Sequence, residues 1–173
     1  SSMFDHPLEI LTLCHEKVRL FALLTDKLQT HVAQHGADDA AAQAAQKVLR
    51  YFNIAAPLHH DDEDLDVYPA LLALSEDRLQ GAQKTVLAAA IHRLQNEHTE
   101  LARLWTDARQ WLEQIEQKQS VTPPATLKQF IQAYPHHADC EEAEIYPFIE
   151  LLEPHTLQVI GQRMAQRRGA KHT

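Results

Sequence analysis

Apolar residues recur along most of the chain at the three- and four-residue spacing of amphipathic helices. The first stretch has Pro7 where an opening helical turn tolerates proline, and it runs to Gly36, a residue that favours helix ends. Asp38 and Asp39 offer caps for the second stretch, whereas residues 120–124 interrupt the period before the fourth. The pattern predicts helices at residues 5–36, 39–72, 75–117 (with a break near Gly81), 127–152 and 153–169.

These elements predict an all-α, up-down-up-down four-helix bundle over residues 5–152, with a short fifth helix at residues 153–169. The 173 residues suit a single domain, which we expect to span residues 3–173. The chain has 4 glycines, too few for the turns of a β-sandwich or for a glycine-rich phosphate loop. All-β and dinucleotide-binding folds are therefore disfavoured.

The chain is acidic, with 24 Asp and Glu against 16 Lys and Arg and a formal net charge of −8. An acidic surface repels nucleic acid and anionic membranes. The sequence has no apolar run of about 18 residues, and two cysteines are too few for a disulfide framework. We therefore expect a cytoplasmic protein that binds neither nucleic acid nor membranes, and a homodimer is compatible with the sequence.

One segment occurs twice. Residues 57–69 read PLHHDDEDLDVYP, and residues 135–147 read PHHADCEEAEIYP. Aligned without a gap, the copies share Pro57/Pro135, His59/His137, Asp61/Asp139, Glu63/Glu141, Tyr68/Tyr146 and Pro69/Pro147. Each HxxxE places its histidine and glutamate one turn apart on one helix face. Such a pair alone is a common accident, but the shared prolines and tyrosines are not. Pro57 and Pro135 also predict a local kink in each helix.

Two facing HxxxE pairs place two carboxylates in the apolar middle of a bundle, where they repel unless a cation lies between them. The other two long helices each offer a histidine within an apolar stripe, His15 and His98. The four histidines follow at intervals of 44, 39 and 39 residues, which returns an up-down chain to one level. The sequence therefore predicts a buried metal site formed by His15, His59, Glu63, His98, His137 and Glu141.

This pattern resembles the hemerythrin-like, HHE cation-binding family, in which a single histidine alternates with HxxxE along four helices and Tyr-Pro or Phe-Pro follows each HxxxE. The resemblance covers about residues 5–152. It implies a carboxylate-bridged di-iron site with two bridging glutamates and two histidines on each iron. The implied sets are Glu63 and Glu141 as bridges, His15 with His59, and His98 with His137. Mixed nitrogen and oxygen donors suit iron, and also zinc or manganese.

The resemblance implies a protein that binds or senses O2 or NO, or handles iron, and it favours a binding protein over an enzyme. Oxygen-carrying hemerythrins have a second histidine one turn from the first on the third helix. Here Leu94 and Ala102 flank His98 at that spacing, which favours the branch linked to nitric oxide response and iron–sulfur cluster repair. The alternatives are a di-iron enzyme acting on NO or peroxide, and a metal-free helical interaction module.

Residues beside the candidate ligands have simpler interpretations. His60 and His136 lie one position from the chosen histidines, about 100° round the helix, and we assign them outer or surface roles. Cys14 and Cys140 adjoin candidate ligands in sequence. A cysteine in such an apolar stripe is most often a buried small hydrophobe, with a redox role as the alternative.

Two further clusters are interpreted without a binding role. His31, His35 and Asp39 follow one another at four-residue spacing, but Gly36 interrupts the helix between them, so we expect no metal site there. The basic residues at 163–172 are expected to form a solvated helix terminus.

Overall fold

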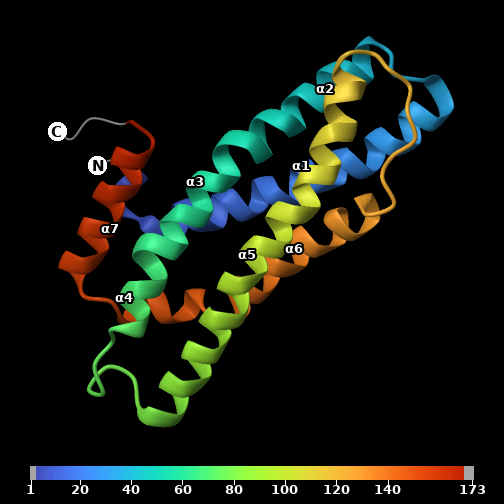
Figure 1. Ribbon diagram of the computed structural model, residues 1–173. Coiled ribbons are helices and arrows are strands. Elements are labelled where there is room, and N and C mark those ends of the chain that lie inside the picture. Colours follow the sequence, from blue (N-terminus) through green and yellow to red (C-terminus); the bar gives the residue numbers. More distant parts are fainter. Residues whose placement is uncertain (1–2, 170–173) are drawn as a thin grey trace.

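The computed structural model describes residues 3–169, and every regular element within that range is helical. The long elements are α1 (Pro7–His35), a helix over residues 39–72, α5 (Gly81–Glu116) and α6 (Leu127–Glu144). Figure 1 shows these four segments running alongside one another, with α7 (Pro154–Arg167) set outside them near the N-terminal end of the chain. The predicted all-α bundle is confirmed.

Two π-helical turns interrupt the second long helix. It consists of α2 (Asp39–Arg50), the π-helical η2 (Tyr51–Ala55), α3 (Ala56–Asp61), the π-helical η3 (Asp62–Val67) and α4 (Tyr68–Leu72). The carboxylate of Asp38 caps its start, as predicted, by accepting the Ala41 amide hydrogen at 2.9 Å.

Each π-helical turn comes shortly before a proline. Pro57 and Pro69 lack the N–H group that an α-helix uses, and their rings would collide with the carbonyl group four residues back. In η3 the helix widens, and the Tyr68 N–H binds the Glu63 carbonyl five residues back; η2 is built in the same way. The kink expected at Pro57 therefore takes the form of a π-helical turn, whereas Pro135 lies inside α6 without such a turn.

Two predicted helix boundaries are wrong. Residues 75–80, assigned to the third helix, form turns in which the Ser75 carbonyl accepts the backbone N–H groups of residues 78 and 79. α5 begins only at Gly81, where the sequence indicated a break. α6 ends at Glu144 instead of residue 152, shortly before Pro147, which lacks the N–H group that a further α-helical turn would use; the chain tightens into the 3₁₀-helix η4 (Tyr146–Leu151).

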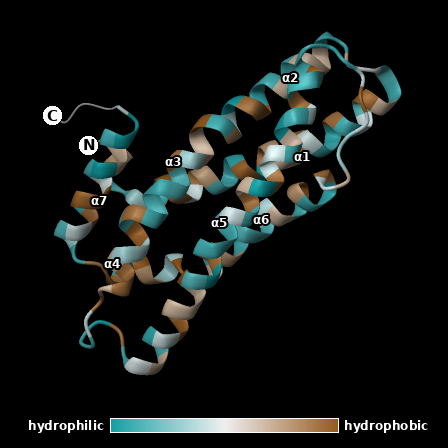
Figure 2. Cartoon of the chain, in the orientation of Figure 1, coloured by the Kyte–Doolittle hydropathy of each residue, from teal (hydrophilic) through white to brown (hydrophobic). Residues whose placement is uncertain are grey.

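Two apolar clusters fill the interior, one toward each end of the bundle. The first includes Val18, Leu28, Phe52, Leu104, Trp111 and Phe130, and the second includes Leu11, Leu71, Leu87, Ile91, Ile145 and Ile149. On α1 the second cluster reaches Leu11 and the first begins at Val18, so His15 lies between them; the other long helices repeat this pattern. Figure 2 shows hydrophilic and hydrophobic residues alternating along each helix.

α7 packs on α1, on η3 and on the 3₁₀-helix η1 (Met3–Asp5). Gly161 permits a very close approach, because a Cβ atom at this position would lie 1.9 Å from the Phe4 carbonyl oxygen. None of the helices within residues 3–169 combines the length and apolar character that crossing a membrane requires.

Candidate metal centre

The structure brings the six predicted residues to one level inside the bundle, between the two apolar clusters. α1 supplies His15, α3 supplies His59, η3 supplies Glu63, α5 supplies His98, and α6 supplies His137 and Glu141. All are buried, with at most 8 % of each residue exposed. The regular return of the chain to one level, expected from the spacing, is therefore observed.

These residues form two groups of four that share both glutamates. One group is His15, His59, Glu63 and Glu141, and the other is Glu63, His98, His137 and Glu141. In each group, one ligand atom per residue lies within 4.8 Å of all the others. Within the HxxxE pairs, Nε2 to Oε1 is 3.4 Å for His59 and Glu63 and 3.3 Å for His137 and Glu141. The search of residues 3–169 finds no further group of this kind.

Several buried polar atoms of these groups have no hydrogen-bond partner within the described part of the chain. They are Nε2 of His59, His98 and His137 and Oε1 of Glu63. A polar atom left unpaired in a protein interior costs about 1–3 kcal/mol. A cation between the groups would bind these lone pairs and balance the two buried carboxylates. The donor set therefore fits a metal ion.

Without a metal, protons on the histidines compensate the carboxylates. Burial raises the pKa of Glu63, but the positive charge of the adjacent His59 outweighs it, and the pKa lies well below its usual range. Burial lowers the pKa of His98, whereas the hydrogen bond to Asp64 and the nearby carboxylate of Glu63 raise it to about 10. The same balance raises the pKa of His59 and of His137. A cation that takes these nitrogens must displace the protons.

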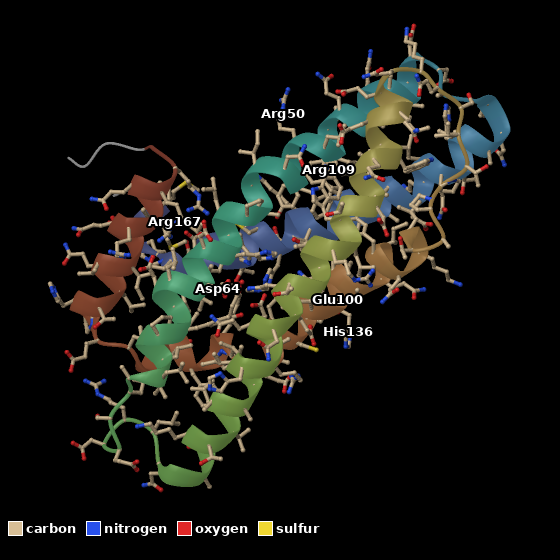
Figure 3. All side chains as sticks on the ribbon, in the orientation of Figure 1. Arg50, Asp64, Glu100, Arg109, His136 and Arg167 are labelled. Carbon is tan, nitrogen blue, oxygen red and sulfur yellow. The ribbon has the colours of Figure 1, made fainter. Side chains whose placement is uncertain are left out.

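Three of the four histidines donate their outer nitrogen to a carboxylate. The Nδ1 pairs are His15 with Glu142 at 2.7 Å, His98 with Asp64 at 3.0 Å, and His137 with Glu97 at 2.9 Å. Such bonds fix the ring and turn the Nε2 lone pair toward the site. Sequence analysis missed these carboxylates, although Asp64 and Glu142 each follow the glutamate of a repeat copy. Figure 3 shows Asp64 on the helix over residues 39–72, on the side near α5.

Two buried tyrosines cross between the repeat copies. Tyr68 donates a hydrogen bond to Glu141, and Tyr146 donates one to Glu63 Oε2 at 2.8 Å. Tyr146 also stacks on His15, with ring centroids 4.9 Å apart. The tyrosine of each copy thus holds the glutamate of the other. The matched position of the two tyrosines was the available sequence signal, but helical periodicity does not tell which glutamate each one reaches.

The basic C-terminal stretch is docked on the site helix, so its prediction as a solvated terminus is wrong for Arg167 and Arg168. Arg167, labelled in Figure 3, lies 2.6 Å from Asp62 and 2.7 Å from Asp66, and Arg168 lies 2.6 Å from Asp62. Asp62 is fully buried and needs this compensation. Both aspartates belong to η3, which also carries Glu63. The predicted basic stretch continues into residues 170–172, which lie outside the described residues.

His60 lies beside the centre, outside both groups of four, which agrees with the outer role predicted for it. Its ring stacks on His98 at a centroid distance of 4.1 Å, and its Nε2 lies 3.3 Å from the Tyr134 hydroxyl group. A surface pocket of about 400 Å³ is lined by His60, His98, Tyr134, Phe52 and Trp105, among others. The pocket therefore reaches an imidazole of the site.

The cluster near the end of α1 is not among the groups of residues 3–169 whose ligand atoms converge. His31 Nε2 lies 2.9 Å from Asp38, the residue that caps α2, and does not bind Asp39. The chain turns at Gly36 between these elements.

Both cysteines are partly exposed, so their prediction as buried small hydrophobes is wrong. Cys140 Sγ lies 3.5 Å from Nε2 of the exposed His136. The carbonyl oxygen of Cys14 accepts the Tyr51 hydroxyl hydrogen at 2.9 Å, and its side chain lines a surface pocket. Both residues sit at the edge of an apolar stripe, where periodicity alone does not decide burial.

The chain matches a known family over most of its length. Residues 6–149 match the model of the hemerythrin HHE cation binding domain. A protein from Haemophilus influenzae, described as uncharacterized, is 32% identical over 170 residues, which cover 97% of this chain and 93% of that protein. The chain therefore belongs to the hemerythrin HHE cation-binding family, and its buried histidines and glutamates are suited to a metal site.

Proposed function

We propose that this protein holds two iron ions in a carboxylate-bridged centre. The observation that carries the proposal is the pair of buried four-residue groups that share both glutamates. In this assignment, Glu63 and Glu141 bridge the ions, His15 and His59 bind one, and His98 and His137 bind the other.

The donor set and the surrounding charge support iron. Four imidazoles and two carboxylates form the mixed nitrogen and oxygen set that iron accepts, and zinc and manganese are the competing ions. Two ferrous ions carry four positive charges, against two negative charges on the glutamates. The outer carboxylates Asp64, Glu97 and Glu142 add negative charge around the same centre. The carboxylates at and around the site therefore balance the positive charge of two divalent cations.

We further propose that the centre binds or senses a small diatomic ligand, O2 or NO. Bound iron would supply open coordination positions, because each ion receives two histidines in addition to the shared glutamates. The pocket of about 400 Å³ at His98 supports entry of a small ligand from the surface. The two apolar clusters above and below the site exclude bulk water.

The residues around the centre hold its donors in place. Tyr68 and Tyr146 fix the two bridging glutamates, and the outer carboxylates fix three of the imidazoles. Because these partners are themselves packed in the bundle, little reorganisation would accompany ligand binding.

An enzyme that consumes NO or peroxide at the same centre is the second candidate. The observation in its favour is that two phenols contact the bridging carboxylates. Burial, together with the negative charge of Glu63 and Glu141, raises the pKa of Tyr68 and of Tyr146. Both hydroxyl groups therefore keep their protons at neutral pH and place a proton source at the site.

Titration of the ferrous protein with NO under anaerobic conditions separates the two candidates. A binding protein gives a saturable spectral change that stops at a fixed ratio of NO to iron. An enzyme continues to consume NO or peroxide beyond that ratio when an electron donor is supplied. Protein that contains two irons but neither binds nor consumes these molecules contradicts both assignments. Glu141→Ala is the control, since loss of its bridge should abolish the signal.

A further inference from the structure

The centre has an approximate two-fold symmetry that extends to the outer hydrogen bonds. α1 and α5 each supply one histidine, and each repeat copy supplies one HxxxE pair. Asp64 of the first copy binds His98, and Glu142 of the second copy binds His15. These two carboxylates occupy the same repeat position, so the symmetry relates α1 to α5 and one copy to the other.

The same symmetry relates Glu97 to Cys14. Glu97 directly precedes His98 on α5, and it accepts a hydrogen bond from Nδ1 of His137 at 2.9 Å. The residue that directly precedes His15 on α1 is Cys14. The partner expected at Nδ1 of His59 is therefore a thiol, where the other half of the centre has a carboxylate.

His59 is the histidine that lacks a carboxylate partner. It is 2% exposed, and its Nδ1 has no hydrogen-bond partner within residues 3–169. Its Nε2 faces Glu63, so Nδ1 points away from the centre. Burial lowers the pKa of His59, whereas Glu63 and the Cys14 thiol raise it, which agrees with the position that the symmetry gives this thiol behind the imidazole.

Cys14 is also accessible from outside. A pocket of about 290 Å³ is lined by Cys14, Tyr51, Leu58 and Arg168, among others. Its backbone is held by the Tyr51 hydroxyl group, which donates to the Cys14 carbonyl oxygen. A small thiol reagent that enters this pocket reaches the thiol that the symmetry places behind His59.

We infer that Cys14 is the outer partner of His59 and a modification site through which thiol reagents weaken one half of the centre. Cys14 is a positioning residue: with a metal ion at Nε2 of His59, its sulfur would accept the Nδ1 hydrogen and orient the ring. The inference rests on the proposed metal centre. A thiol is a weaker acceptor than a carboxylate, so the ion held by His15 and His59 is the more weakly held of the two. The other ion has carboxylates behind both of its histidines.

The test uses Cys140→Ser, which leaves Cys14 as the single thiol. N-ethylmaleimide adds to Cys14 by forming a sulfur–carbon bond while the thiol proton passes to the neighbouring carbon of the former double bond. Loss of an outer partner typically costs 10–100-fold in metal affinity. We expect modification to speed the release of one of the two metal ions to a chelator by about 10-fold or more, with the other ion unchanged. Cys14→Ser protein treated in the same way, modified only at Cys140, should release metal at the untreated rate.

Cys14→Asp sharpens the test because it installs the carboxylate that Glu97 provides in the other half. This variant should slow the release of the weakly held ion. Equal acceleration of both ions after modification, or unchanged release in every Cys14 variant, overturns the inference.

A readout without metal separates this inference from the proposed function. In metal-free protein, Cys14→Ala should shift the ¹⁵N resonance of His59 Nδ1 and leave that of His137 unchanged. A chain that never takes up metal but shows this shift contradicts the proposed centre and leaves the Cys14–His59 contact standing. An unmoved His59 resonance contradicts the contact, whatever the metal content.

Discussion

The two copies of the repeated segment, residues 57–69 and 135–147, present the same side chains from helices that are built differently. In the first copy, η3 widens the helix ahead of Pro69, and the helix continues. In the second copy, the α-helix ends at Glu144 and a 3₁₀-helix follows. The histidine, the glutamate, the following acid and the tyrosine nevertheless reach the same level in both copies.

The two copies also differ in the ion pairs that they form on the side facing away from the centre. Asp66 of the first copy is buried against Arg167 of α7. Its counterpart Glu144 forms an exposed ion pair with Arg93, and the glutamate side chain is 40% exposed. The copies are thus alike where they face the centre and different where they face away from it. Both copies place the same set of side chains at the centre, although the helices and ion pairs that hold these side chains differ.

The largest expected effect concerns the shared glutamates. Glu63→Ala and Glu141→Ala should each lose both metal ions, since each carboxylate belongs to both groups of four. Elemental analysis of the purified variants measures this, with circular dichroism to verify folding. His60→Ala is the matched control and should keep its metal, because His60 lies outside both groups. A glutamate variant with full occupancy would refute the bridging assignment, and emptying of the His60 variant would identify His60 as a ligand.

The scaffolds are distinguished by removing the arginines that support each copy. The Arg167→Ala/Arg168→Ala double variant leaves Asp62 buried without compensation, and we expect the free energy of unfolding to fall by about 3 kcal/mol. Arg93→Ala breaks the exposed pair with Glu144 and should change it by less than about 1 kcal/mol. Urea unfolding of the metal-free proteins compares them. Equal losses would show that α7 is not a special support of the first copy.

The crossed tyrosines test the symmetry of the centre. Tyr68→Phe and Tyr146→Phe each remove a hydrogen bond to a buried carboxylate, so each should lower the free energy of unfolding by about 2 kcal/mol. Tyr134→Phe serves as the control, because its hydroxyl group makes only a 3.3 Å contact with His60. Thermal or urea unfolding provides the measurement. A large effect from one tyrosine and none from the other would break the two-fold relation.

The last prediction concerns a change of stability with pH in the metal-free protein. The pKa of folded His98 is raised from 6.5 to about 10, so its contribution is complete below about pH 6.5 and is lost as pH rises toward 10. His59 and His137 shift in the same direction. The free energy of unfolding should therefore decline over this range, and the slope should be shallower in His98→Gln. A free energy of unfolding that rises with pH across this range would contradict the protonation of these histidines in the folded, metal-free protein.

Much of the architecture follows from the sequence because helical periodicity and the spacing of His15, His59, His98 and His137 are local quantities. An apolar stripe predicts a helix, and a near-constant interval predicts a common level. The six candidate residues needed no knowledge of loop geometry. The crossing of Tyr68 to Glu141 depends on how two distant helices face each other, which no periodicity contains.

The remaining differences arise where a local signal competes with packing. Arg167 and Arg168, at the C-terminal end of α7, belong to a basic segment typical of a solvated terminus. They nevertheless form ion pairs with Asp62, because this aspartate is buried and needs a positive charge beside it. The π-helical turns come from Pro57 and Pro69, whose sequence signal indicates a disturbed helix without saying whether it kinks or widens. The relation between Cys14 and Glu97 emerges only once the symmetry of the centre is known.

The central claim is that two metal ions lie between the repeat copies. Metal content per chain, measured with an absorption spectrum on aerobically purified protein, tests it most directly. The proposal predicts two iron atoms per chain with near-ultraviolet charge-transfer absorption. Two zinc ions would keep the site but remove its redox role. Protein that stays free of metal after anaerobic reconstitution with ferrous iron would contradict the centre and leave a helical interaction module.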